Sequence, residues 1–186
     1  MAGAASQTRT ITVEDYLAAE QRTCVKHEYV DGYVYAMGGA SDRHNIIAGN
    51  FFAALHAHIP ERCQVFMADM RLRIRLEKAE IFYYPDILVS CAEDDRAQYH
   101  REKPVLLVEV LSASTERVDR TEKFDAYRRI ATLDEYVIAE QEVPEIEVYR
   151  RRNSWKREVL ASGTVLILGS VELELSVDAI YRRTGL

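Results

Sequence analysis

The sequence predicts an α/β (α+β) fold in which a mixed central β-sheet is flanked by helices. Near-continuous apolar runs, typical of strands covered on both faces, alternate with amphipathic segments of helical period. These segments follow in the order helix, hairpin, helix, three strands, helix and further strands, which is the order of a mixed α and β domain. The 186 residues fit one core. We therefore expect a flexible tail at residues 1–10 and a single domain at residues 11–186.

The first predicted elements are a short helix, a hairpin and a longer helix. Thr12 can cap a helix that runs to Glu20. Residues 28–37 form the hairpin, because Asp31 and Gly32 tolerate the positive φ of a two-residue turn. Ser41 can cap the second helix. The residues on one stripe of that helix are His44, Ile47, Ala48, Phe51 and Leu55.

The middle of the chain predicts three strands and a helix. Residues 71–76 alternate with period two, which places Arg71, Arg73 and Arg75 on the face opposite the apolar side chains. Residues 81–90 and 105–111 are apolar strands joined by a polar loop. A helix follows at residues 119–130, where Asp119 and Glu122 resemble a capping box.

The last third predicts extra antiparallel strands and a closing helix. Residues 136–139, 146–149 and 155–160 have strand character, and Asn153 with Ser154 joins the last two. Residues 165–175 add one more strand region, and residues 177–183 predict a short helix.

Composition limits the classes of protein. The 48% hydrophobic and 29% charged content is typical of a soluble globular chain, and no apolar run reaches the roughly 18 residues that span a membrane. With no secretory signal read, we expect a cytoplasmic protein without a membrane partner. The net charge of −6 argues against coating of nucleic acid by bulk electrostatics, but not against a metal-assisted enzyme.

The three cysteines predict neither a disulfide framework nor a zinc site. Cys24, Cys63 and Cys91 are odd in number and widely spaced. We expect them to be small hydrophobic side chains in a reducing cytoplasm.

Two acids in apolar strands are the strongest chemical signal. Glu109 shares a strand face with Leu107 and Leu111, and Asp86 follows Pro85 at the start of another apolar run. Alternatively, these are strand-end acids held by an arginine or by backbone donors. Two carboxylates about 4 Å apart repel by on the order of 4 kcal/mol at an effective dielectric of 20. A divalent cation relieves this repulsion, and oxygen ligands favour Mg²⁺ or Mn²⁺.

Three further residues are weaker candidates. Asp119, Lys123 and Tyr127 share one helical face, so Lys123 either points back toward the acids or is a surface lysine paired with Asp119. His44 is either a functional residue or a satisfied core histidine. Glu28 is either a functional acid or an exposed strand end.

Six segments in order resemble the Uma-two family, whose members are described as candidate restriction endonucleases of the PD-(D/E)XK nuclease superfamily. The segments are residues 28–37, 41–44, 85–86, 108–115, 119–127 and 136–138. The resemblance runs from about residue 12 to residue 181. It implies a restriction-endonuclease-like core, with a mixed sheet flanked by helices.

The resemblance also assigns roles by position. It implies that Asp86 and Glu109 bind metal, with Glu28 and the carbonyl of Val110 as further ligands. His44 matches the histidine of the family, which implies a place near the scissile phosphate. The wider superfamily has a lysine two residues after the second acid, where this chain has Leu111. Lys123 is the candidate replacement.

The expected function is therefore a Mg²⁺- or Mn²⁺-dependent endonuclease that hydrolyses DNA. One alternative is a nuclease-fold protein with weak or no activity that acts as a nucleic-acid-binding or regulatory module. Another is a hydrolase of smaller phosphate esters. The arginines of residues 71–75 and 150–157 either touch a phosphate backbone or lie on solvated strand faces. A homodimer is expected, since cutting both strands of a duplex benefits from two-fold symmetry.

Overall fold

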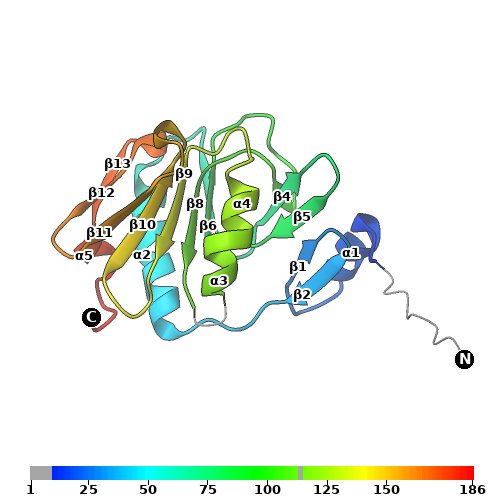
Figure 1. Cartoon of the computed structure of the whole chain (residues 1–186), viewed down its shortest axis with the longest axis horizontal. Helices are drawn as coiled ribbons and strands as arrows, with labels where there is room; N and C mark the ends of the chain where they lie inside the picture. The colour runs from blue at the N-terminus through cyan, green and yellow to red at the C-terminus, as the bar shows by residue number, and fades with distance from the viewer. Residues whose placement is uncertain (1–9, 113–114) are drawn as a thin grey trace, which may run out of the picture.

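The centre of the protein is a six-stranded mixed sheet (Figure 1). The computed structural model describes residues 10–112 and 115–186, so most of the predicted tail and residues 113–114 of the family segment lie outside the described residues. The strand order is β11-β10-β9-β8-β6-β3, with β8 and β9 parallel and the other pairs antiparallel. The strands are β3 Gln64–Met67, β6 Ile87–Ser90, β8 Pro104–Val110, β9 Glu135–Ala139, β10 Glu145–Arg150 and β11 Arg157–Ala161.

A second sheet of five strands continues the fold toward the N-terminus, in the order β2-β1-β5-β4-β7. Its strands are β1 His27–Val30, β2 Tyr33–Ala36, β4 Arg71–Arg75, β5 Glu80–Tyr83 and β7 His100–Arg101. Asp31 and Gly32 have φ of 48° and 92°, which confirms the predicted hairpin turn. Helix α1, Val13–Glu20, is capped by Thr12 as expected, and its Tyr16 ring packs 5.1 Å from the Tyr29 ring.

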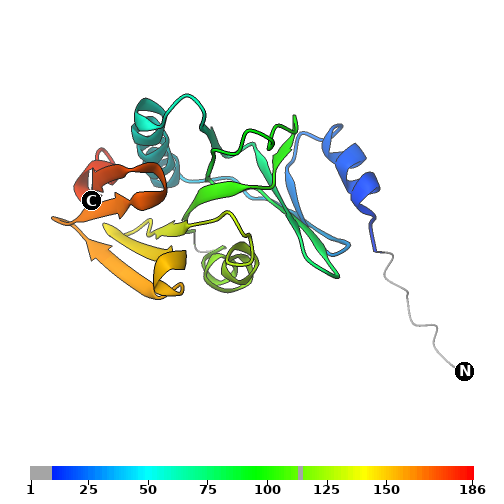
Figure 2. The ribbon, with the colours of Figure 1, turned by 90° about the horizontal axis from the view of Figure 1, so that it is seen from above.

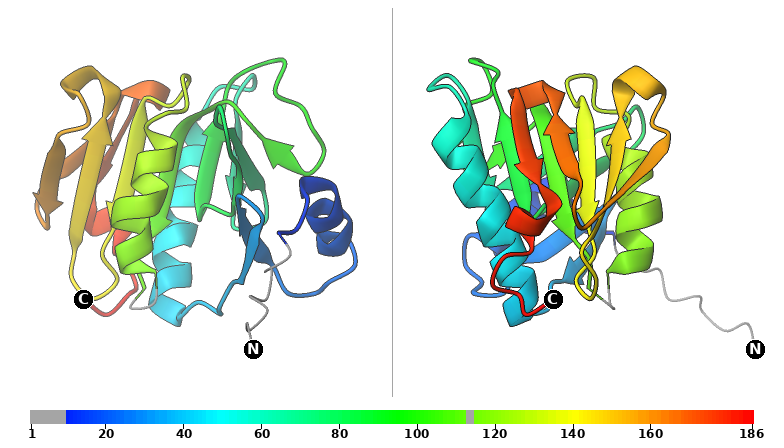
Figure 3. Two further views of the ribbon diagram at one scale, coloured as in Figure 1. Left: turned by 45° about the vertical axis from the view of Figure 1, so that its right-hand side comes forward. Right: turned by 90° about the vertical axis from the view of Figure 1, so that its left-hand side faces the viewer.

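Helices cover both faces of the six-stranded sheet. Helix α2, Asp42–His58, lies on one face and the helical segment of residues 116–127 lies on the other (Figures 2 and 3). Ser41 caps α2, and the predicted apolar stripe from Ile47 to Leu55 is buried. The remaining elements are β12 Val165–Leu168, β13 Leu173–Ser176, α5 Val177–Ile180 and the 3₁₀ turns Arg151–Asn153 and Gly169–Val171. In the described part of the chain, no helix is long and apolar enough to cross a bilayer.

The predicted single strand at residues 81–90 is wrong. The chain leaves the five-stranded sheet after Tyr83 and enters the six-stranded sheet at Ile87. Pro85 lies between them and has no amide hydrogen to donate to a strand ladder. The break therefore places Asp86 at the junction of the two sheets. Strand β3, which pairs with β6, was not predicted.

The predicted helix at residues 119–130 begins earlier and is irregular. It consists of α3 Glu116–Val118, a π-helical turn Asp119–Lys123 and α4 Phe124–Tyr127. Asp119 is therefore not a cap but a residue inside the helix, with only 1% of its surface exposed. In sequence, Asp119 three residues before Glu122 resembles a capping box. In the structure, the Asp119 side chain is buried and pairs with Lys123. Single π turns are common at functional sites.

The prediction of three separate cysteine thiols is also wrong, because Cys63 and Cys91 form a disulfide and only Cys24 is free. The β3–β6 ladder pairs Gln64 with Ser90, so the residues just beyond that pair face each other. The sequence did not reveal this pairing because β3 was missed.

Reduction of the disulfide is expected to destabilise the protein. The bond closes a loop with a sequence separation of 28. The chain-entropy relation gives about 3–4 kcal/mol for a loop of this size, as an upper estimate. Urea unfolding with and without dithiothreitol measures the change, with Cys24→Ala as the control variant. Three free thiols in the oxidised, denatured wild type would contradict the pairing.

Candidate functional site

A cavity of about 630 Å³ lies where the two sheets meet the helical segment. Its lining includes every residue that the sequence marked for catalysis or metal binding. These are Glu28 from β1, His44 from α2, Asp86 from the β5–β6 junction, Glu109 and Val110 from β8, and Lys123 from the π turn. The fold thus brings together side chains that are distant in sequence.

Glu109 is buried in the face of β8 that also carries Leu107 and Leu111. It is 3% exposed, and both leucines belong to the core under the helical segment. Lys123 Nζ donates to Glu109 Oε1 at 3.1 Å, and the Tyr127 hydroxyl donates to the same oxygen at 2.8 Å. Leu111, at the position where the resemblance led us to look for a lysine, packs in the core. The ammonium group of Lys123 reaches Glu109 from the helical segment instead.

Lys123 is held among three carboxylates and is not a surface lysine. Its Nζ lies 3.0 Å from Asp119 Oδ1, 3.1 Å from Glu109 Oε1 and 3.2 Å from Glu28 Oε1. The ring of Tyr83 covers it at 5.5 Å from the ring centroid. The π turn buries Asp119 and Lys123 together, so both side chains point into the cavity.

Asp86 is fixed from two directions. Its Oδ1 lies 2.9 Å from His44 Nε2, and its Oδ2 accepts the backbone amide of Val110 at 2.8 Å. When Asp86 is ionised, Nε2 of His44 is the donor of this hydrogen bond. His44 therefore contacts an acid of the site directly and is not a core histidine remote from it.

The electrostatics of the cavity are unbalanced. Burial raises the pKa of Glu109 well above its usual range; Lys123 opposes this shift, and Asp119 and Asp86 add to it. Burial alone would lower the pKa of Lys123, but Glu109, Glu28 and Asp119 outweigh it and raise that pKa. Lys123 is thus an ammonium ion that faces more carboxylates than it can neutralise.

Two carboxylate oxygens have capacity left for a ligand. Among the described residues, the buried atoms Glu28 Oε1 and Asp119 Oδ1 accept no hydrogen bond, although both lie at ion-pair distance from Lys123. Buried acceptors normally find a donor. An oxygen-rich site with surplus negative charge fits a hard divalent cation.

Asp119 and Tyr127 are site residues whose roles the sequence did not reveal. The pattern marked Asp119 as a cap or as a surface partner of Lys123, and it marked Tyr127 only as a residue on the same helical face. Their spacing of i, i+4 and i+8 with Lys123 was the usable signal. Lys26 and Tyr35 also line the cavity, and no sequence pattern pointed to them.

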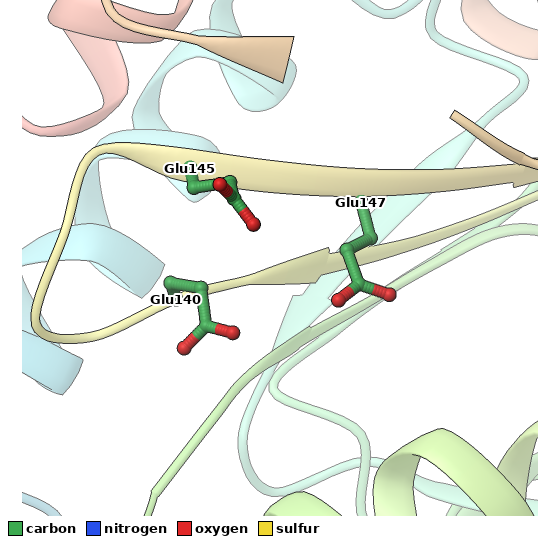
Figure 4. A group of neighbouring side chains, drawn as sticks. All are labelled: Glu140, Glu145 and Glu147. Atoms are coloured by element: carbon green, nitrogen blue, oxygen red, sulfur yellow. The ribbon is translucent and has the colours of Figure 1, made fainter. Parts of the chain in front are cut away.

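A second group of acids lies on the β9–β10 pair: Glu140, Glu145 and Glu147 (Figure 4). Their oxygens are close enough to share an ion. However, Arg120 pairs with Glu140 and Glu147, and Arg157 pairs with Glu145 and Glu147. Burial raises the pKa of Glu147, but hydrogen bonds from Arg157, Tyr149 and Arg120 outweigh it and lower the pKa to about 2. Each acid of this group is already paired with an arginine, and Arg120 anchors the π turn to the sheet.

Comparison with known proteins identifies the family and the fold of the chain. Residues 13–179 match the model of the Uma2 family, described as "Putative restriction endonuclease". Two uncharacterized proteins of Synechocystis are each 34% identical to the chain. One alignment covers 92% of this chain and 92% of the relative, and the other covers 77% and 82%.

A solved structure shares the fold. The crystal structure of "a putative nuclease" from Anabaena variabilis superposes with a TM-score of 0.72 at 16% identity, and covers 92% of this chain and 97% of that chain. At this identity the likeness concerns the fold alone. Because the family model and the relatives span most of its length, the chain belongs to the Uma2 family of restriction-endonuclease-like proteins.

Proposed function

We propose that this protein is a divalent-metal-dependent endonuclease that hydrolyses DNA phosphodiester bonds. The observation that carries the proposal is the cluster of buried Glu109 and Asp119 and partly buried Glu28 around Lys123, beside Asp86 and in one cavity. Such a surplus of buried carboxylates is costly unless a cation or a catalytic role accounts for it. Family membership supports nuclease chemistry in particular.

The cluster fits Mg²⁺ or Mn²⁺. Asp86, Glu109, Glu28 and the carbonyl of Val110 would hold the ion, and Asp119 Oδ1, which faces Lys123, would be a further ligand. When bound, the ion supplies a water of lowered pKa and neutralises charge on the scissile phosphate.

The other side chains hold the acids and meet the developing charge. His44 and the Val110 amide orient Asp86, while Tyr127 fixes Glu109. Lys123 would stabilise negative charge that accumulates on the phosphate, as preorganised donors do in water-excluded sites.

One observation favours the alternative of a nucleic-acid-binding or regulatory module without strong activity. Leu111 is packed in the core, so the superfamily's lysine on the catalytic strand has no counterpart there. Lys123 must then perform that role from the helix. If it does not, the fold keeps a binding site without cleavage.

The proposal includes a cellular location and an oligomeric state. A cytoplasmic location would give the protein access to DNA. A homodimer would hold two such sites in one particle.

Removal of either central acid is expected to abolish cleavage. Single- and double-stranded DNA are incubated with wild type, Asp86→Ala and Glu109→Ala in Mg²⁺ or Mn²⁺, with an EDTA arm. We expect cleavage by the wild type that falls at least about a hundredfold in each variant, because an ion ligand is lost. Equal cleavage by all three proteins would mean a contaminating nuclease and no activity of this site.

Replacement of Lys123 is expected to make stability depend on metal. Lys123→Met leaves two buried carboxylates and the partly buried Glu28 without their ammonium, and loss of a buried partner typically costs about 3–5 kcal/mol. Added Mg²⁺ should therefore raise the melting temperature of Lys123→Met more than that of wild type. Lys103→Met, at an exposed lysine paired with Asp94, is the matched control. The same Mg²⁺ response in all three proteins would remove Lys123 from the ion site.

A further inference from the structure

The β1–β2 hairpin places two tyrosines beside the acids. Tyr33 and Tyr35 are 50% and 54% exposed, and because they are two residues apart they lie on the same face of β2. Tyr35 lies directly opposite Glu28 in the β1–β2 ladder, so the two side chains share a face about 5 Å apart at Cβ. Tyr35 also lines the catalytic cavity. A tyrosine strip therefore starts at the acids and continues outward along the edge strand.

The rings of this strip have free faces. Among the described residues, neither ring packs against another aromatic ring or under a cation. Other tyrosines do make such contacts: Tyr16 stacks with Tyr29, and Tyr83 packs against Tyr127 and Lys123. Two large rings left open next to a catalytic cavity are suited to a flat apolar partner, and a nucleic-acid base is one.

The spacing of the rings distinguishes between strand states. Side chains at i and i+2 of a strand are about 6.6–6.8 Å apart. Bases in a duplex follow at about 3.4 Å along each strand and lie stacked inside it. Two rings at twice that spacing match the bases of an extended, unstacked strand.

Most arginines that could contact the phosphates of a long duplex already pair with acidic side chains. Duplex binding draws mainly on lysine and arginine contacts to phosphates. Arg73 and Arg75, which the sequence offered for this task, pair with Glu80 and Glu102. Two arginines of the second candidate group are paired as well. Arg150 pairs with Glu135 and Glu158. Arg157 pairs with Glu145 and Glu147. The chain carries a net charge of −6, so stacking has to supply much of the affinity.

We propose that the substrate of this site is unpaired DNA, with two bases stacked on Tyr35 and Tyr33 so that the adjoining phosphate lies at the acids. This inference rests on the proposed function, because it assigns the substrate class of the same cavity. Tyr33 and Tyr35 are binding residues here, and neither takes part in bond cleavage.

Binding measurements test the inference without cleavage. The probes are a fluorescein-labelled 12-nucleotide strand of mixed sequence and the same strand annealed to its complement, with Ca²⁺ replacing Mg²⁺. Fluorescence anisotropy compares wild type, Tyr33→Ala, Tyr35→Ala and Tyr35→Phe. Tyr99→Ala is the matched control, because this tyrosine is also 50% exposed but does not line the cavity.

We expect the unpaired strand to bind wild type at least about tenfold more tightly than the duplex. Each alanine variant should weaken strand binding by about five- to hundredfold, which is the range for loss of one base–aromatic stack. Tyr35→Phe and Tyr99→Ala should bind like wild type. Equal binding of strand and duplex, unchanged binding by both alanine variants, or an equal loss in Tyr99→Ala would each overturn the inference.

Its failure and that of the proposed function are distinguishable. Cleavage that depends on Glu109 but is indifferent to Tyr35 would remove the tyrosine strip and keep the endonuclease. Strand binding that depends on Tyr35 in a protein without cleavage would keep the strip and remove the endonuclease.

Discussion

The ammonium group of Lys123 is the contact on which the arrangement of the site depends. Glu28 belongs to the five-stranded sheet, Glu109 to the six-stranded sheet and Asp119 to the π turn, and all three meet at this one nitrogen. A buried charge without partners is expensive, so the three elements have to keep these positions relative to one another. The same contact leaves net negative charge in the cavity, which is the physical reason to expect a metal ion there.

Supports on both faces of the six-stranded sheet hold this contact in place. On one face, Arg120 clamps the π turn to Glu140 and Glu147, which fixes the direction of Lys123. On the other, α2 holds His44 against Asp86. Catalytic groups need such support, because small misplacements reduce rates strongly. The second acid group is therefore part of the scaffold of the site, although it superficially resembles a metal centre.

The sequence predicted the features that depend on local pattern, and it missed those that depend on distant partners. Caps at Thr12 and Ser41 and the Asp31–Gly32 turn follow from a few neighbouring residues, and the structure has them. Glu109 was found because a carboxylate in an apolar strand is anomalous wherever it occurs. The exchange of sheets at Pro85 required knowledge of which strands pair.

The remaining misses have the same origin. Asp119 resembles a cap until its partner Lys123 is seen to be buried with it. The Cys63–Cys91 bond depends on β3, a short strand that pairs with β6 at the edge of the sheet. Tyr35 looks like an ordinary hairpin residue until the ladder sets it opposite Glu28. Each of these roles is created by a contact between segments far apart in the chain.

Calorimetric titration with Mn²⁺ tests the central claim, that these acids form a metal site, most directly. The titration compares wild type with Glu109→Gln, which keeps the shape of the side chain and removes its charge. The control is Glu145→Gln, in the second acid group but not paired with Arg120. We predict binding that weakens at least about tenfold in Glu109→Gln and is unchanged in Glu145→Gln. Binding lost in Glu145→Gln and retained in Glu109→Gln would contradict a metal site at these acids.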